Sequence, residues 1–128
     1  MKFHKTFATL AIAFGMIAPA MAQDLSPVGT WQTASGESRY AVNYCGDGTQ
    51  LCAKLTWLRK DAQTPQNLAL LNKVVVNGAE QAAENKWRGT LNYQGKKVSG
   101  SVTLLGQNQM QLRGCQFTAC KDIGLVRI

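Results

Sequence analysis

Four cysteines, seven carboxylates and one histidine are the residues of this 128-residue chain best suited to chemistry. Nucleophilic Ser-His and Cys-His pairs need an imidazole, and so do the common histidine-ligated zinc sites. The histidine is His4, however, and it lies in a segment that resembles an export signal. Two carboxylates could still act as acid and base, but the sequence places no two of them across one cleft. We therefore expect a protein that is not an enzyme and that holds neither a metal nor a cofactor.

The first 22 residues have the three parts of a secretory signal. Lys2 and Lys5 give a basic start, residues 7–18 are apolar, and residues 20–22 read Ala-Met-Ala, a small-x-small cleavage pattern. The apolar run is too short to span a bilayer, and no later stretch reaches the roughly 18 apolar residues of a membrane helix. We expect a signal peptide over residues 1–22 and a single domain over 23–128. The mature protein would be periplasmic or secreted, with no integral membrane segment.

Charge patterning argues against nucleic acid as a partner. The whole chain carries +7, and removal of Lys2 and Lys5 leaves +5. The remaining basic residues are scattered, with only Arg59-Lys60 and Lys96-Lys97 adjacent. Such a pattern is typical of a solvated surface rather than of a nucleic-acid-binding stripe. We also expect the mature protein to be a monomer.

The cysteines predict two short disulfide-bonded loops. An exported chain enters an oxidising compartment, where thiols form disulfides. Four cysteines permit three pairings, and their spacing favours Cys45 with Cys52 and Cys115 with Cys120. A zinc site made of four thiolates is the alternative, which oxidation of the thiols disfavours.

The first cysteine pair suggests a strand register. If Cys45 faces Cys52 across an antiparallel hairpin, one face becomes apolar and aromatic while the disulfide lies on the other. Residues 47–50 read Asp-Gly-Thr-Gln, a composition typical of the tight turn that would connect the two strands. The inner face would place Tyr40 opposite Trp57, Val42 opposite Leu55, and Tyr44 opposite Ala53.

The second cysteine pair behaves in the same way. If Cys115 faces Cys120, Arg113 faces Asp122 on the outer face, where opposite charges support the register. Arg127 then lies on the inner face near the end of the last strand. The other inner pairs would be Leu112 with Ile123 and Met110 with Leu125.

Alternating segments between these hairpins predict eight strands in all. Short strands with one apolar face and hairpin connections indicate a closed, antiparallel up-and-down barrel. The connections 59–72 and 78–85 are expected to be irregular, with one helical turn within 79–84. The expected strands are 28–33, 39–45, 51–58, 73–77, 86–93, 97–104, 109–115 and 120–127.

The predicted interior is rich in aromatic residues. An eight-stranded barrel has room for side chains or for one small ligand, and we favour a packed core. Inward-facing glycines at 89, 100 and 114 leave a ligand cavity as the alternative, because they either bend the strands or create space. The residues that would line such a cavity are Tyr40, Val42, Tyr44, Leu55, Trp57, Trp87, Leu91 and Tyr93.

Residues at the two ends of the domain resemble a pattern found in a known family of proteins. Gly29-Thr30-Trp31 opens the first strand and Arg127 closes the last one, which resembles the lipocalin and wider calycin pattern. In that pattern the tryptophan packs under an arginine from the final strand, a cation–π contact of about 1 to 2 kcal/mol when desolvated. The resemblance implies that Gly29, Trp31 and Arg127 close one end of the barrel.

A second resemblance covers nearly the whole mature chain. Its motifs are Gly29-x-Trp31, Cys45 through Leu51-Cys52-Ala53-Lys54-Leu55-x-Trp57-Leu58, Lys86-Trp87-x-Gly89-x-Leu91-x-Tyr93, Leu112-Arg113-Gly114 and Val126-Arg127. Their order is similar to the bacterial domain-of-unknown-function family 2147. The resemblance implies a small exported protein with a lipocalin-like barrel, and it implies no reaction. The chain departs from the pattern after Tyr93, over 61–72, and in adding Cys115 and Cys120.

Two functions fit these expectations. The first is a carrier or sensor that holds a small apolar or amphipathic ligand inside the barrel. The second is a protein-binding module of the cell envelope, such as a hydrolase inhibitor, that acts through its disulfide-stapled hairpin tips. Phe117 is an apolar residue at one such tip, where a purely solvated turn would not need one. A hollow interior would favour the first function.

Overall fold

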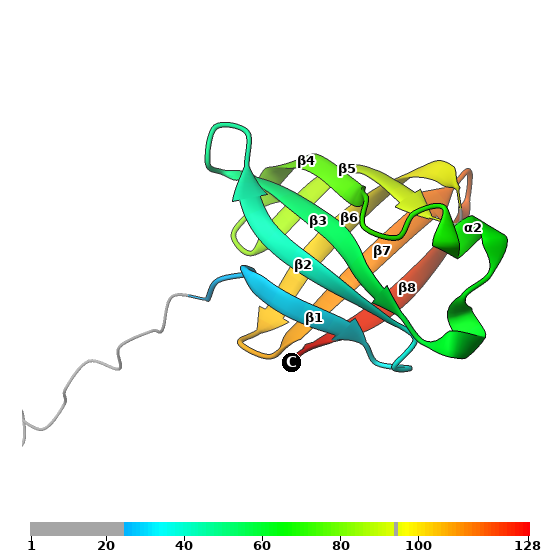
Figure 1. The fold of residues 1–128 in the computed structure, drawn as a ribbon. Coiled ribbons are helices and arrows are strands. Elements are labelled where there is room, and N and C mark those ends of the chain that lie inside the picture. Colours follow the sequence, from blue (N-terminus) through cyan, green and yellow to red (C-terminus); the bar gives the residue numbers. More distant parts are fainter. Residues whose placement is uncertain (1–24, 94) are drawn as a thin grey trace, which may run out of the picture.

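The computed structural model describes residues 25–93 and 95–128 of the chain. They form eight antiparallel strands, in which each strand pairs with the next and β8 pairs with β1 to close a barrel (Figure 1). The predicted all-β barrel is thus confirmed, whereas the predicted signal peptide lies outside the described residues. The strands are β1 (Gly29–Thr33), β2 (Ser38–Cys45), β3 (Gln50–Leu58), β4 (Val74–Ala83), β5 (Lys86–Tyr93), β6 (Lys96–Gly106), β7 (Gln109–Gln116) and β8 (Ala119–Arg127).

Strand β4 is longer than its sequence pattern predicts. The helical turn expected within 79–84 is wrong, because this segment continues β4 and pairs with β5, with Glu80 opposite Arg88 and Gln81 opposite Trp87. The alanines and glutamates here favour a helix, but that propensity is weak compared with pairing in a closed sheet. Asn85 turns the chain with a φ of 59°, a left-handed conformation that asparagine tolerates well.

Both predicted disulfides are present, and the second hairpin has the predicted register. Cys115 faces Cys120, and Arg113 faces Asp122. The first hairpin is offset by two residues, so that Cys52 faces Asn43 rather than Cys45. An offset of two preserves which side each residue faces, so the predicted separation into inner and outer faces survives along most of this hairpin.

A β-bulge overturns one predicted orientation. The register shifts between Arg39, which faces Trp57, and Tyr40, which faces Leu55, so β3 carries one extra residue at Thr56. An extra residue exchanges the faces beyond it. Trp57 therefore lies on the outside of the barrel, 37% exposed, with the Arg39 guanidinium carbon 4.2 Å from its ring centroid. The prediction that Trp57 points inward is wrong.

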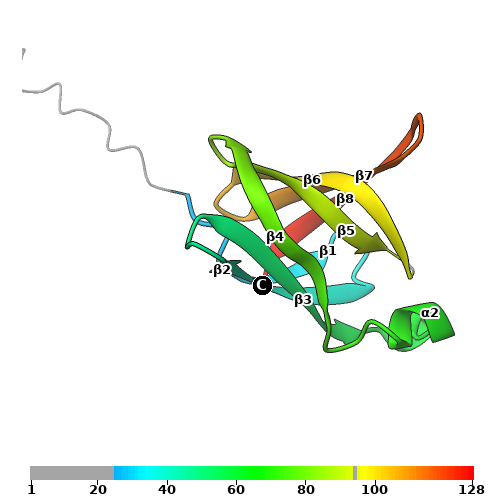
Figure 2. The same ribbon diagram turned by 90° about the horizontal axis from the view of Figure 1, so that it is seen from above.

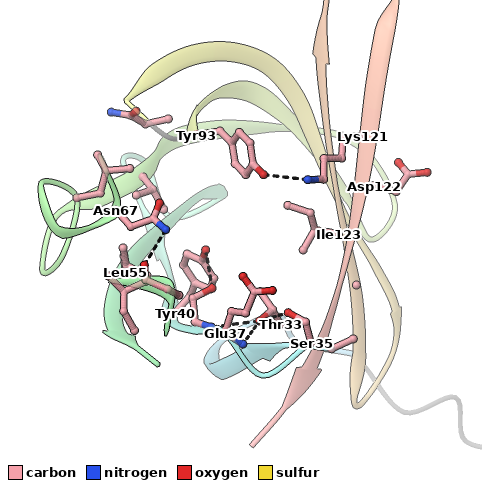
Figure 3. Close-up of a pocket in the computed structure, with 18 residues that line it drawn as sticks. Thr33, Ser35, Glu37, Tyr40, Leu55, Asn67, Tyr93, Lys121, Asp122 and Ile123 are labelled. Atoms are coloured by element: carbon pink, nitrogen blue, oxygen red, sulfur yellow. Dashed lines mark hydrogen bonds between the residues drawn. The ribbon is translucent and has the colours of Figure 1, made fainter. Parts of the chain in front are cut away.

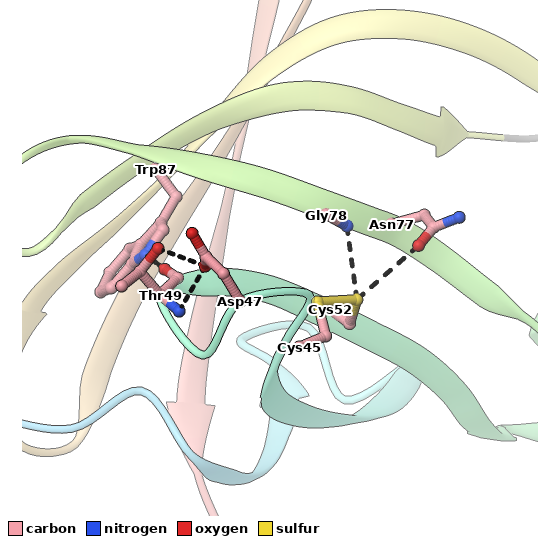
Figure 4. Close-up of a disulfide and its surroundings, with 7 residues drawn as sticks. All are labelled: Cys45, Asp47, Thr49, Cys52, Asn77, Gly78 and Trp87. Carbon is pink, nitrogen blue, oxygen red and sulfur yellow. Dashed lines mark hydrogen bonds between the residues drawn. A yellow bond between two sulfur atoms is a disulfide. The ribbon is translucent and has the colours of Figure 1, made fainter.

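One end of the barrel, here called the closed end, is filled with side chains. Trp31 is fully buried and its indole N–H donates to the Pro27 carbonyl at 2.8 Å. The indole N–H of Trp87 donates to the Thr49 carbonyl at 3.1 Å, beside the Cys45–Cys52 disulfide (Figure 4). The other buried residues at or near this end include Leu51, Val102, Leu104, Met110 and Leu125.

At the opposite end, here called the open end, the segments that connect the strands surround the opening of the barrel, and aromatic rings do not fill it. The β3–β4 connection carries a 3₁₀ turn, η2 (Lys60–Ala62), and a single-turn helix, α2 (Pro65–Leu68). Thr64 caps α2 by accepting from the Asn67 amide at 3.2 Å. Figure 2 shows the β7–β8 hairpin projecting away from the barrel at this end. Among the residues described here, no helix has the length and apolarity to cross a membrane.

Candidate functional site

The open end of the barrel contains a cavity with two adjoining compartments. Their volumes are about 380 Å³ and about 260 Å³, and the larger value falls within the range of small-molecule sites. Because they share lining residues, we treat them as one space and call it the cup. The shared residues are Tyr40, Val75, Asn92, Tyr93, Lys121 and Ile123.

The cup has apolar walls at depth. The second compartment lies against Val76, Leu91, Val98 and Leu112, which come from β4, β5, β6 and β7. A further apolar space of about 30 Å³ lies where the cup meets the packed half and is bordered by Met110. The barrel is therefore filled at one end and hollow at the other, a division that the sequence analysis did not predict.

A lysine and a tyrosine form a polar pair on one side of the cup. The Lys121 ammonium donates to the Tyr93 hydroxyl at 3.1 Å (Figure 3) and lies 5.5 Å from the centroid of the Tyr93 ring. The hydrogen bond to Tyr93 raises the pKa of Lys121 above its ordinary value. Lys121 therefore carries a full positive charge at neutral pH.

A second tyrosine is held on the other side of the cup. The Ser38 hydroxyl donates to the Tyr40 hydroxyl at 3.1 Å. Burial raises the pKa of Tyr40 above 10.0, with the Ser38 hydrogen bond opposing part of that effect, so the phenol stays neutral. The Thr33 hydroxyl accepts from the amides of Glu37 and Ser38 at 2.9 and 3.2 Å, which fixes the turn that carries Glu37 into the cup (Figure 3).

Two amide side chains complete the polar part of the site. Asn67 Nδ2 donates to the Ala62 carbonyl at 2.9 Å and so ties α2 to the wall of the cup. Asn92 Oδ1 is buried without a hydrogen-bond partner within the described part of the chain. It is an acceptor suited to a hydroxyl or an amide N–H.

The residues predicted to line a cavity fall into four places. Tyr40, Leu55, Leu91 and Tyr93 line the cup, and Val42 lines the small space beneath it. Trp87 lies buried at the closed end, and Trp57 lies outside. The Tyr44 ring has its centroid 6.5 Å from that of Trp87 but is 44% exposed, so the prediction that Tyr44 lines the interior is wrong. The structure thus brings half of the predicted set into one cavity.

The three inward glycines also differ in what surrounds them. A Cβ at Gly100 would overlap Leu91, and a Cβ at Gly89 would meet the Ala79 backbone at 3.0 Å, so neighbours already fill both positions. Gly114 lines the cup, and its nearest neighbour would be Val98 at 3.3 Å. Only Gly114 of these three borders the cup.

Sequence reasoning missed two charged residues of the cup and the amide of Asn67. Lys121 could have been found, because the correct β7–β8 register already places it on the inner face, opposite Gly114. Its position two residues from the turn then puts it at the rim. Glu37 and Asn67 lie in connections, where no alternation indicates which way a side chain points.

Phe117 occupies the hairpin tip next to the cup. It is 96% exposed and has a φ of 59°, a left-handed conformation that costs an L-residue about 1 to 2 kcal/mol. Gln116 and Ala119, on either side of the two-residue turn, line the second compartment. An unfavourable backbone conformation and full exposure of an aromatic ring thus coincide at one position.

Comparisons with known proteins place the chain in a family. Its fold is similar to a solved structure described as protein HP1028 from the human pathogen Helicobacter pylori, which belongs to the lipocalin family. The TM-score is 0.60 at 14% identity, over 81% of this chain and 84% of that one, so the likeness concerns the fold alone. No curated protein matches the chain. The model of the family of uncharacterized proteins conserved in bacteria, domain of unknown function 2147, matches residues 29–123, and the chain therefore belongs to that family.

Proposed function

We propose that this protein is an exported, non-enzymatic carrier or sensor that holds a small amphipathic molecule in the cup. The observation that carries the proposal is the cup itself, a cavity of several hundred Å³ with apolar walls and a polar rim. Specific small-molecule sites commonly combine an apolar lining with a few placed polar groups. The lipocalin-like fold of the structural neighbour also supports a binding role.

Binding is best tested with an environment-sensitive dye rather than by intrinsic fluorescence. Trp31 and Trp87 belong to the closed end and Trp57 lies outside, so none of the three tryptophans lines the cup. The neutral dye N-phenyl-1-naphthylamine, which brightens in apolar surroundings, is a suitable probe. We expect saturable enhancement with the purified mature protein.

A matched pair of variants locates the dye. Ile123→Trp places an indole in both compartments of the cup, whereas Leu105→Trp adds the same group on the outer surface, where Leu105 is 58% exposed. We expect the first variant to lose the dye signal and the second to keep it, with folding of both checked by circular dichroism. No enhancement in the wild type, or equal binding by the two folded variants, contradicts the proposal.

The exported location is a separate part of the proposal. It rests on the signal-like residues 1–22 and on two disulfides, which are typical of oxidising compartments. Expression of the full chain in a Gram-negative host should give a periplasmic protein whose N-terminus is Gln23. Recovery of an unprocessed cytoplasmic protein would contradict this part while leaving the cup to be tested on its own.

Phe117 supports a second candidate function, a protein-binding module of the cell envelope. A rigid, stapled hairpin presents an aromatic side chain at low entropic cost. A pull-down from envelope extract with the wild type should recover a partner, such as a hydrolase, that Phe117→Ala fails to recover. Leu105→Ala, which truncates another exposed apolar residue on the barrel wall, is the control. Recovery of the same proteins by Phe117→Ala would contradict a role for this tip.

A further inference from the structure

We infer that the cup selects amphiphiles with a single anionic head group, which the Lys121 ammonium receives beside Tyr93 while the apolar part enters the second compartment. This inference deepens the proposed function and rests on it. It assigns Lys121 as the residue that determines specificity and a carboxylate-type group as its ligand.

The first support is the position of Lys121. Register places it on the inner face of β8 opposite Gly114, and it borders both compartments of the cup. The ammonium is then held at the rim by the 3.1 Å hydrogen bond to the Tyr93 hydroxyl (Figure 3). The side chain is otherwise exposed, so the ammonium is accessible to the head group of a ligand.

The second support is that no carboxylate of the described residues forms an ion pair with this cation, and the charge of Glu37 across the cup is only the weakest of the influences on the pKa of Lys121. The ion pairs of the described residues are Arg59 with Asp61 and Arg113 with Asp122, so Lys121 is in neither. Its sequence neighbour Asp122 lies in the outer ion pair, with its carboxylate 3.3 Å from the Arg113 Nε. An ammonium has three donors, and Tyr93 takes one, which leaves two for water or a ligand.

The third support is the division of charge and apolar surface within the cup. Lys121 borders the second compartment, whose deeper walls are Val76, Leu91, Val98 and Leu112. Glu37 borders the first compartment, on the β1–β2 side, and does not border the second. A ligand that extends its apolar part between β4 and β7 therefore places its head nearest the positive charge.

Three ligands with the same tail test the inference. Decanoate, decanol and decylamine carry heads of charge −1, 0 and +1 and can each displace N-phenyl-1-naphthylamine at neutral pH. Since a hydrogen bond to a charged group is stronger than a neutral one, we expect decanoate to bind about tenfold more tightly than decanol, and decylamine most weakly. The preference should diminish as salt is added.

Two charge variants should move the affinities in opposite directions. Lys121→Met should abolish the preference for decanoate over decanol, while decanol affinity changes less than about twofold because the apolar contacts remain. Glu37→Gln should strengthen decanoate binding and weaken decylamine binding. Lys54→Met removes an exposed lysine of β3 that does not border the cup, and it should leave all three affinities unchanged.

The outcomes separate this inference from the proposed function. If the dye binds but decanoate is no better than decanol, or if the preference survives Lys121→Met, the anionic selectivity is overturned and the cup remains a binding site. If the dye does not bind the wild type at all, the proposed function fails and the inference fails with it.

Discussion

The guanidinium carbon of Arg127 lies 4.3 Å from the centroid of the Trp31 ring. Three carbonyls hold it there, because Nε donates to Gln107 at 2.8 Å, Nη1 to Val28 at 2.7 Å and Nη2 to Ser26 at 2.6 Å. This one side chain therefore ties the segment before β1 and the β6–β7 turn to a buried indole at the closed end.

Truncating this arginine should destabilise the barrel. Arg127→Ala removes a cation–π contact and three charge-assisted hydrogen bonds, and we expect it to lower the free energy of unfolding by about 2 to 4 kcal/mol. Urea denaturation with an unchanged m-value would measure the loss. Arg113→Ala, which breaks an exposed ion pair with Asp122, should cost no more than about 1 kcal/mol. Equal losses in the two variants would contradict this account of the closed end.

The two disulfides should stabilise the barrel independently. Each closes a short loop, with sequence separations of 7 and 5 residues, so replacing either pair by serines should cost about 2 to 2.5 kcal/mol in the chain-entropy model. Because the bridges lie at opposite ends of the barrel, the loss in the quadruple variant should equal the two separate losses added together, within about 0.5 kcal/mol. Urea denaturation of the three variants checks this, and a larger deviation would show that the two hairpins are coupled.

The fold could be predicted from alternation because a closed sheet must bury one face of every strand. The β7–β8 register was predictable in full, since Cys115 and Cys120 are a directly facing pair across a two-residue turn. The β2–β3 register was not, because Cys45 and Cys52 bond without facing each other. Nothing in the spacing of two cysteines distinguishes a direct pair from a diagonal one.

The site was less predictable than the fold. The bulge that turns Trp57 outward depends on how β2 and β3 fit together around the barrel, and alternation along one strand cannot reveal it. Alternation likewise gives Gly100 and Gly114 the same inward orientation, although a neighbour fills one position and the cup borders the other. Whether a barrel is hollow depends on the summed volumes of side chains from several strands.

These two glycines should therefore respond differently to the same substitution. In Gly100→Ala the new Cβ would overlap Leu91 and lie 2.5 Å from the Arg113 carbonyl oxygen, and such overpacking should cost about 1 to 3 kcal/mol. In Gly114→Ala the nearest neighbour is a Val98 methyl at 3.3 Å, so stability should change by less than about 1 kcal/mol. Thermal unfolding of the two variants, recorded together with the wild type, makes the comparison. A larger loss for Gly114→Ala would contradict the placement of Gly114 at the border of the cup.

Tyr40 should make the stability of the barrel fall at alkaline pH. Burial raises the pKa of its phenol above the ordinary 10.0, so the folded state holds this proton more tightly than the unfolded state. The resulting stabilisation is fully present below pH 10 and is lost as the pH rises from about 10 through the folded-state pKa. Tyr40→Phe cannot ionise, so we expect its free energy of unfolding to fall less steeply above pH 10 than that of the wild type.

Two measurements check this prediction. Urea denaturation at several pH values between 8 and 11 gives the slopes, and Tyr44→Phe, which removes the hydroxyl of an exposed tyrosine outside the cup, is the matched control for the loss of a hydroxyl as such. Ultraviolet titration of the phenols should in addition show a late-ionising tyrosine in the wild type that is missing in Tyr40→Phe. Because Tyr40 borders both compartments of the cup, a bound apolar ligand should delay that ionisation further. Identical slopes in Tyr40→Phe and the wild type would show that this phenol is solvated rather than buried in the wall of the cup.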